Sequence, residues 1–233
     1  MTPATFSIIV PVLDEAQGIV ACLAGLQEGR SAGAEVIVVD GGSRDDTRAL
    51  AAPLADRVIE APRGRAAQMN AGARASRGEI LVFLHADTVL PPGALGHVTA
   101  GLAASGRAWG RFDVAIAAAD PLLAVVAIFM NARSRLTGIA TGDQAMFARR
   151  AAFESVGGFP DIALMEDVAL STRLRRVTRP LCIATRVVTS GRRWQRHGTL
   201  RTILLMWRLR LEYALGADPG RLARRYDVER ISS

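Results

Sequence analysis

Acidic side chains come directly after three short apolar runs, each of which is typical of a buried strand. The acidic residues concerned are Asp14, Glu15, Asp40 and Asp87. Carboxylates accept hydrogen bonds, and they are the ligands that hard divalent cations such as Mg²⁺ and Mn²⁺ prefer. Because parallel strands deliver their carboxyl ends to one edge of a sheet, we expect these carboxylates to converge on a ligand there.

The second acidic position lies in the segment Val39–Thr47 (VDGGSRDDT), where two glycines follow Asp40. One interpretation is that the glycines form a tight turn and leave Asp40 facing a crevice. The other is that Asp40 only starts a turn and that Asp45 or Asp46 caps the next helix. This segment alone does not choose between them. A dinucleotide-binding turn is excluded, because no GxGxxG follows the first strand.

The third acidic position belongs to the triplet His85-Ala86-Asp87. Side chains two apart on a strand point the same way, so we expect His85 and Asp87 to face one site. A strand-end aspartate beside a diphosphate is typical of a Mg²⁺ or Mn²⁺ site. The alternative is that Asp87 is a turn former without a ligand.

Apolar runs that alternate with helical patterns must position these residues. They predict an α/β fold with a mostly parallel sheet that helices cover on both faces. The expected strands lie near residues 6–10, 35–39, 58–59, 80–84, 108–116, 144–148 and 181–188. The expected helices lie near residues 15–27, from 45, 65–75, 93–103, 121–136, from 166 and from 200.

The length of 233 residues fits one domain. We expect a nucleotide-binding half over about 1–90, an acceptor-binding half over 91–195 and a helical appendage over 196–233. The net charge is +7, and all 29 basic residues are arginines. This charge is compatible with a phosphorylated ligand, a nucleic acid or an anionic membrane. We expect Cys22 and Cys182 to be reduced thiols and, without a secretory signal, a cytoplasmic location.

Four motifs occur in order: IIVPVLDE, VVDGGSRDDT, GRAAQMNAGARAS and FLHADT. Together this set resembles the family-2 glycosyltransferases. The resemblance spans roughly residues 6–195, and it implies the GT-A (Rossmann-like) fold, a nucleotide-diphosphate sugar donor, usually with UDP, and a divalent cation, Mg²⁺ or Mn²⁺. It also implies an inverting, hexosyltransferase-type enzyme.

The same resemblance implies roles for individual residues. Asp40 would accept a hydrogen bond from the base, and Asp87 would bind the metal. The first carboxylate of the usual DxD triplet is replaced by His85. The residues that the resemblance places around the donor are Pro11, Asp14, Glu15, Asp40, Gly42, Arg65, His85, Arg192 and Arg193. For Arg65, in an alanine-rich helix, packing is the alternative.

The stretch Gly157–Pro160 (GGFP) and the acidic pair after it resemble the family's GGF…ED region. There the aspartate that matches Asp167 is the general base, with Glu166 the second candidate, and it takes the acceptor's hydroxyl proton. The alternative for both residues is helix capping. The resemblance assigns acceptor contacts to Gly142, Asp143 and Trp194, and metal ligation to His197, for which simple exposure is the alternative.

The last expected helix carries apolar residues at helical spacing, among them Leu204, Trp207 and Leu211. We expect this stripe to pack in the core. The alternative is peripheral contact with the inner face of an anionic membrane, which would bring a lipid acceptor close. The chain resembles a small soluble bacterial group found with arsenosugar biosynthesis genes, which suggests a small-molecule acceptor. We expect no nucleic-acid partner.

Two rival functions can be compared with glycosyl transfer. A nucleotidyltransferase would need a glycine- and lysine-rich loop after the first strand, and PVLDE is no such loop. A non-catalytic nucleotide-sugar-binding or membrane-associated protein on the same fold is compatible with the loss of the first DxD carboxylate.

Overall fold

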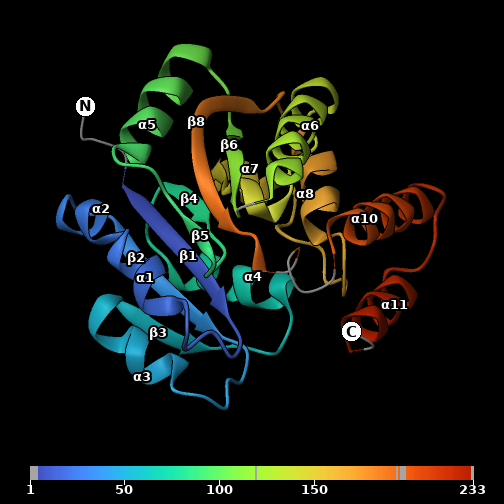
Figure 1. Cartoon of the computed structure of the whole chain (residues 1–233). Helices are drawn as coiled ribbons and strands as arrows, with labels where there is room; N and C mark the ends of the chain where they lie inside the picture. The colour runs from blue at the N-terminus through green and yellow to red at the C-terminus, as the bar shows by residue number, and fades with distance from the viewer. Residues whose placement is uncertain (1–4, 119, 193, 195–197, 232–233) are drawn as a thin grey trace.

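A computed structural model describes residues 5–118, 120–192, 194 and 198–231. One curled sheet of eight strands runs through the molecule in the order β3-β2-β1-β4-β7-β6-β8-β5 (Figure 1). The strands are β1 (Phe6–Val12), β2 (Glu35–Asp40), β3 (Arg57–Glu60), β4 (Ile80–Phe83), β5 (Thr88–Val89), β6 (Trp109–Ala117), β7 (Met146–Arg149) and β8 (Leu181–Ser190). The expected α/β architecture with a mostly parallel sheet is confirmed.

The strands β1 to β4 of the first half run parallel to one another. β1 pairs with β2 and β4, and β2 pairs with β3. The second half joins through antiparallel pairs of β7 with β4 and with β6, whereas β6 and β8 run parallel. β5 adds a short antiparallel edge to β8. The first half therefore has the open parallel arrangement that places ligands at strand carboxyl ends.

Helices cover both faces of this sheet, which explains the continuous apolar runs. Ile8 and Val10 pack into one cluster with α1 and α5, whereas Ile9 packs into a second with α4, α7 and α8. The α-helices are α1 (Ile19–Ala24), α2 (Gln27–Ser31), α3 (Thr47–Ala51), α4 (Arg65–Ala75), α5 (Ala94–Ser105), α6 (Pro121–Thr137), α7 (Arg150–Ser155), α8 (Glu166–Leu174), α10 (Thr199–Ala214) and α11 (Pro219–Ile231).

The prediction of one helix over residues 15–27 is wrong. Helix α1 begins only at Ile19, and the chain turns before α2 begins at Gln27. The residues before α1 form a loop whose Asp14 has a left-handed backbone with φ of 53°. That loop exists because its backbone N–H groups donate to side chains of the next loop, a non-local effect that helical periodicity does not reveal.

The unpredicted elements include the two-residue strand β5 and the helices α2, α7 and α11. The expected strand near 144–148 begins later, because residues Gly142–Gln144 form a 3-10 turn before β7. The expected terminal helix from 200 ends at Ala214, and α11 follows after Gly216, whose φ is 91°. Glycine permits this left-handed turn without strain.

The two C-terminal helices pack against the segment before α8. Leu209 and Tyr226 form a third apolar cluster with Leu164 and Met165. The expected core packing of the apolar stripe on α10 is wrong, because side chains of the stripe are exposed. The exposed members are Leu200, Leu204, Trp207, Leu211 and Leu215. Within the described ranges, no helix combines the length and hydrophobicity needed to cross a bilayer.

Candidate functional site

The carboxyl ends of β1, β2 and β4 lie along one edge of the sheet (Figure 1). The chain passes from β1 to β2 on one side and later returns to place β4 on the other side of β1. Such a reversal of strand order leaves a crevice at the strand ends. The loops after these strands carry Asp14, Glu15, Asp40 and Asp87, so the structure brings the predicted acidic residues to one edge.

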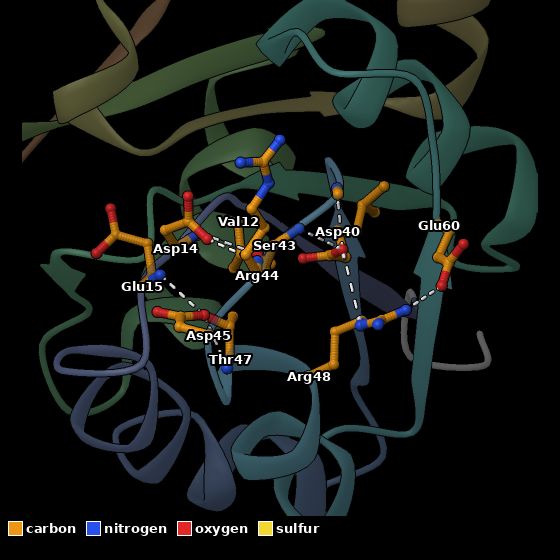
Figure 2. Close-up of polar contacts among 12 residues, drawn as sticks. Val12, Asp14, Glu15, Asp40, Ser43, Arg44, Asp45, Thr47, Arg48 and Glu60 are labelled. Atoms are coloured by element: carbon orange, nitrogen blue, oxygen red, sulfur yellow. Dashed lines mark hydrogen bonds and ion pairs between the residues drawn. The ribbon is translucent and has the colours of Figure 1, made fainter.

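The loops after β1 and β2 hold each other through hydrogen bonds (Figure 2). The backbone N–H of Asp14 donates to Ser43 Oγ at 2.9 Å, and the backbone N–H of Arg44 donates to Asp14 Oδ1 at 2.8 Å. The backbone N–H of Glu15 donates to Thr47 Oγ1 at 2.8 Å. Asp14 is exposed and its carboxylate is partly used in this contact, so its first role is to join the two loops.

Asp45 extends the same contact. Its Oδ2 accepts the backbone N–H of Ala16 at 3.0 Å, and its Oδ1 accepts the N–H of Thr47 at 3.0 Å and also the Thr47 hydroxyl. These hydrogen bonds, that of the Thr47 hydroxyl above all, lower the pKa of Asp45. Of the two proposed caps, Asp45 therefore binds the start of α3, whereas Asp46 makes no side-chain cap.

Asp40 is fully buried where β2 ends. Its Oδ2 accepts the backbone N–H groups of Gly42 and Ser43, each at 3.0 Å, and Arg48 Nε lies 4.0 Å away. Its Oδ1 is shielded from solvent and has no hydrogen-bond partner among the residues that the structure describes. A buried acceptor without a donor costs about 1–3 kcal/mol. Asp40 thus forms the turn and also retains one oxygen that no described residue pairs.

Gln68 of α4 fixes the ends of β1 and β2 relative to each other. Its buried side-chain amide donates to the carbonyl oxygens of Val12 and Val39, both at 2.8 Å. The amide packs so closely on Gly41 that a Cβ there would lie 3.0 Å from it. The crevice therefore has a floor made by one polar side chain.

Asp87, Glu15 and Arg192 lie together on the other side of β1. Arg192 Nη2 is 3.4 Å from Glu15 Oε2, and the Asp87 carbonyl accepts the backbone N–H of Ser190 at 3.0 Å. Burial raises the pKa of Glu15, the Arg192 charge opposes that shift, and the Asp87 charge adds to it. Ser190 Oγ accepts from Arg192 Nε at 3.2 Å, so this serine supports the arginine.

His85 does not lie on a strand, because β4 ends at Phe83. We expected His85 and Asp87 to face one site because of strand alternation. That reason is wrong, because both residues lie on a turn. His85 Nδ1 is 3.6 Å from Asp143 Oδ1, and a Cβ on Gly142 would lie 2.4 Å from the His85 ring. His85 therefore joins the turn after β4 to the loop that carries Gly142 and Asp143.

Glu166 begins α8 and is 4% exposed. Its Oε1 lies 4.0 Å from Arg65 Nη1, so the helix α4 contributes a cation to this side of the crevice. Burial raises the pKa of Glu166, the neighbouring charge of Asp167 raises it further, and Arg65 opposes the shift. Glu166 is thus a buried carboxyl whose charge depends on Arg65.

Asp167 is half-buried beside Glu166. Its Oδ2 accepts the backbone N–H of Gly142 at 2.8 Å, and its Oδ1 accepts the N–H of Val168 at 2.7 Å. These two contacts orient the carboxylate toward the loop at 142. Each oxygen keeps a further lone pair for a hydroxyl donor.

The GGFP segment is held by Asn70 of α4. Asn70 Nδ2 donates to the Phe159 carbonyl at 2.8 Å, and the Phe159 N–H donates to Asn70 Oδ1 at 3.0 Å. Gly158 has φ of 69°, and a Cβ there would lie 2.7 Å from Asn70 Oδ1. Met165, with φ of 69°, then turns the chain into α8. Gly158 and the contacts of Asn70 therefore fix the segment that leads into Glu166 and Asp167.

The remaining predicted residues divide into two groups. Pro11 lies in β1 and pairs with Val39, Gly42 has φ of 94° in the turn after β2, and Trp194 is half-buried. Arg193 and His197 lie outside the described residues, so their predicted roles stay predictions.

Sequence reasoning missed Ser43, Thr47 and the amide role of Gln68. It also missed Arg133 of α6 and Arg210 of α10, whose guanidinium groups contain buried atoms without hydrogen-bond partners. For Ser43 and Thr47 the signal was present, since a serine and a threonine lie in the turn between two acidic positions. For the two arginines, a sequence that is rich in arginine offers no signal.

Comparison with known proteins agrees with this geometry. A family model described as "Glycosyl transferase family 2" matches residues 7–156. Comparison with curated proteins gives no match.

Several solved structures have the same fold. TarS 1-349 from S. aureus in complex with UDP-GlcNAc has a TM-score of 0.66 at 17% identity, over 80% of this chain and 58% of that one. Mannosyltransferase PcManGT from Pyrobaculum calidifontis, with GDP-Man and Mn²⁺, has a TM-score of 0.60 at 26% identity, over 81% and 57%. Glucosyl-3-phosphoglycerate synthase from Mycobacterium tuberculosis, with Mn²⁺, UDP and glucosyl-3-phosphoglycerate, has a TM-score of 0.59 at 20% identity, over 80% and 71%. The chain thus spans about three fifths of the TarS structure.

The first prediction concerns Gln68. Replacement by leucine leaves the carbonyls of Val12 and Val39 without this donor, so we expect the free energy of unfolding to fall by about 2 kcal/mol. Because the floor of the crevice also changes, we expect UDP affinity to fall by about tenfold. Urea unfolding and calorimetric titration measure the two effects.

The matched control is Gln27→Leu. Gln27 Nε2 also donates to two carbonyls, those of Leu23 at 2.8 Å and Leu54 at 2.9 Å, but away from the crevice. We expect a comparable loss of stability with unchanged UDP affinity. Equal UDP affinities for the two variants would remove Gln68 from the ligand site.

The second prediction concerns Glu166→Gln and pH. Because its pKa is raised above the ordinary 4.5, the folded chain binds this proton more tightly than the unfolded chain does. Stability from this group therefore decreases as pH rises from 4.5 through the folded pKa. Glutamine carries no charge, so the stability of the variant relative to wild type should increase over this range. Thermal unfolding at acid and neutral pH tests this, and a pH-independent difference would contradict it.

Proposed function

This chain belongs to glycosyl transferase family 2, and we propose that it moves a sugar from a nucleotide-diphosphate donor to an acceptor hydroxyl. The observation that carries the proposal is the buried Asp40 carboxylate, which keeps one oxygen without a donor at the carboxyl end of β2. The imide N–H of uracil is a donor of the required kind. UDP-sugars are therefore the donors we propose, as in the complex of TarS.

We place the base near Asp40, with Pro11 and the two joined loops beside it. Because Asp40 Oδ1 is shielded from solvent, its surroundings must shift before a ligand N–H can reach it.

A divalent cation fits the cluster around Asp87 as a partial site. Among the described residues, no group of three or more His, Cys, Asp or Glu side chains is placed to hold a metal ion. Asp87 and the nearby Glu15 are oxygen donors, and Mg²⁺ or Mn²⁺ commonly binds one or two carboxylates together with substrate phosphates. Asp87 would hold the ion. When bound, the ion would stabilise negative charge on the leaving diphosphate.

Asp167 is the general base in this proposal. The acceptor hydroxyl gives its proton to the Asp167 carboxylate while its oxygen forms a bond to the anomeric carbon. The bond from that carbon to the diphosphate oxygen breaks, and the electron pair leaves with the nucleoside diphosphate. Attack opposite the leaving group inverts the anomeric configuration. Arg192 is placed to stabilise the diphosphate charge.

Glu166 supports this arrangement rather than taking the proton. It is almost fully buried and faces Arg65, whereas Asp167 is half-buried and oriented by Gly142. Glu166 therefore positions Arg65 and the start of α8. Gly142 and Asp143, next to Asp167, would contact the acceptor, together with Trp194.

The third prediction tests the base. In Asp167→Asn the amide oxygen can still accept one of the two backbone N–H groups, and the amide nitrogen loses the other. The variant also lacks the carboxylate that accepts the proton. We expect transfer to fall by about 10²–10⁴-fold while UDP affinity stays within about twofold. Transfer from UDP-sugars to an acceptor panel, alongside calorimetry with UDP, measures both.

Asp87→Asn is the paired variant in the same experiment. It should lose the increase in UDP affinity that Mn²⁺ provides and keep the binding measured without metal. Full turnover by Asp167→Asn would remove Asp167 from the base role. Tight UDP binding by the wild-type chain without hydrolysis or transfer would favour the second candidate, a non-catalytic nucleotide-sugar-binding protein. GDP-sugars belong in the donor panel, because PcManGT was solved with GDP-Man.

A further inference from the structure

Two arginines on different helices present buried nitrogen atoms without partners. They are Arg133 of α6 and Arg210 of α10, and both residues are half-buried. Within the described chain, Nε and Nη2 of Arg133 and Nε of Arg210 make no hydrogen bond and are shielded from solvent. A shielded donor that is left unpaired destabilises the folded chain.

Arginines with structural roles in this chain are paired differently. Arg111 is fully buried, and its Nε donates to Ser134 Oγ at 3.0 Å while its Nη2 donates to the Asn131 carbonyl at 3.1 Å. Arg111 also contacts the Asp113 carboxylate. The chain therefore satisfies a buried guanidinium where packing alone is needed. Arg133 lacks such partners.

The two cations also act on each other. Burial, followed by the charge of Arg210, lowers the pKa of Arg133 to about 10, and Asp167 opposes the shift. Arg133 therefore lies near both Arg210 and Asp167. Two like charges close together destabilise the fold unless an anion lies between them.

The position of Arg210 is set by the packing of α10. Thr199 Oγ1 donates to Asp120 Oδ2 at 2.7 Å, which joins the starts of α10 and α6. Leu209, next to Arg210, is fully buried against Leu164 and Met165, directly before the acidic pair. These contacts fix α10 against the start of α6 and against the segment that leads into α8.

We propose that Arg133 and Arg210 form an anion-binding site beside Asp167 that holds a phosphate or carboxylate group of the acceptor. Guanidinium groups bind such anions through paired N–H donors. The assignment to the acceptor rests on the proposed function, because Asp167 is the base there. The donor diphosphate belongs instead to the cluster of Asp87 and Arg192, on the other side of His85.

The anion has two sources with the same chemistry. It is a soluble sugar phosphate or carboxylate, as the small-molecule hypothesis implies, or the phosphate of a membrane lipid. The outer side of α10 suits the second source, because it exposes Leu204, Trp207 and Leu211 together with Arg201 and Arg208. Apolar residues flanked by arginines are typical of helices that lie on anionic membranes.

The test titrates inorganic phosphate into the full chain, with saturating UDP and Mn²⁺ to fill the donor site and again without them. We expect Arg133→Gln and Arg210→Gln each to weaken phosphate binding by about tenfold, the effect of losing one charge-assisted hydrogen bond. UDP affinity should not change. Arg201→Gln, on the exposed side of the same helix, is the matched control and should keep phosphate binding.

Thermal unfolding separates this role from a structural one. Without phosphate, Arg133→Gln removes shielded N–H groups that lack partners among the described residues, so its melting temperature should equal or exceed that of wild type, whereas loss of a structural contact would lower it. Phosphate should stabilise wild type more than the variant. Unchanged phosphate affinity in both variants would overturn the proposal, and so would an equal loss of UDP affinity, which would assign the arginines to the donor.

Vesicles identify the source. If phosphatidylglycerol vesicles displace phosphate from wild type but not from Arg210→Gln, and phosphatidylcholine vesicles do not, the anion is carried by a lipid; phosphate binding that vesicles leave unchanged supports a soluble acceptor. Phosphate binding is measured without transfer. The anion site can therefore survive a failure of the proposed glycosyl transfer, and each is judged by its own measurement.

Discussion

A single buried carboxylate organises the crevice. Asp40 has no exposed surface, and one of its oxygens binds the two backbone N–H groups that close the turn after β2. Ser43 in that turn then accepts the N–H of Asp14, so the turn also fixes the loop after β1. The side-chain amide of Gln68 donates to backbone carbonyls at the ends of the same two strands. The hydrogen bonds of the turn and of Gln68 thus hold the unpaired oxygen of Asp40 in place.

Specific side-chain contacts near the strand ends add to the pairing of β4 with β7 that joins the two halves of the chain. His85 packs on Gly142 so closely that any side chain at 142 would collide with its ring. Asn70 of the first half binds Phe159 of the second through both of its amide atoms. These contacts hold the segment that leads into Glu166 and Asp167 against the first half, although both residues lie far beyond β4 in the sequence. His85 therefore packs against the loop that carries Gly142 and Asp143.

Much of the fold follows from local pattern. Runs such as residues 35–39 predict strands because both faces of the sheet are covered, and the helix over 65–75 was predicted at its observed bounds. Non-local contacts account for the failures. The loop before Ile19 depends on side chains of the next loop. On α10, apolar residues occur on two sides, and periodicity alone does not reveal that Leu209 is buried whereas Leu211 is exposed.

The candidate site was predictable to a similar degree. Acidic residues at strand ends were found because a parallel sheet gathers such ends, and the structure brings them to one edge. Gln68 and Asn70 lie in an alanine-rich helix, where a polar side chain that binds buried carbonyls looks the same as one in solvent. Arg133 and Arg210 come from distant segments, on α6 and α10, and no local pattern links them.

Calorimetric titration of UDP into wild type and Asp40→Asn tests the central claim most directly. The amide oxygen of asparagine can still accept the N–H groups of Gly42 and Ser43, which keeps the turn and places an N–H donor where Asp40 has its unpaired oxygen. If that oxygen binds the base, UDP affinity falls by about tenfold or more with little change in melting temperature. Unchanged UDP affinity in a folded Asp40→Asn chain would contradict the account.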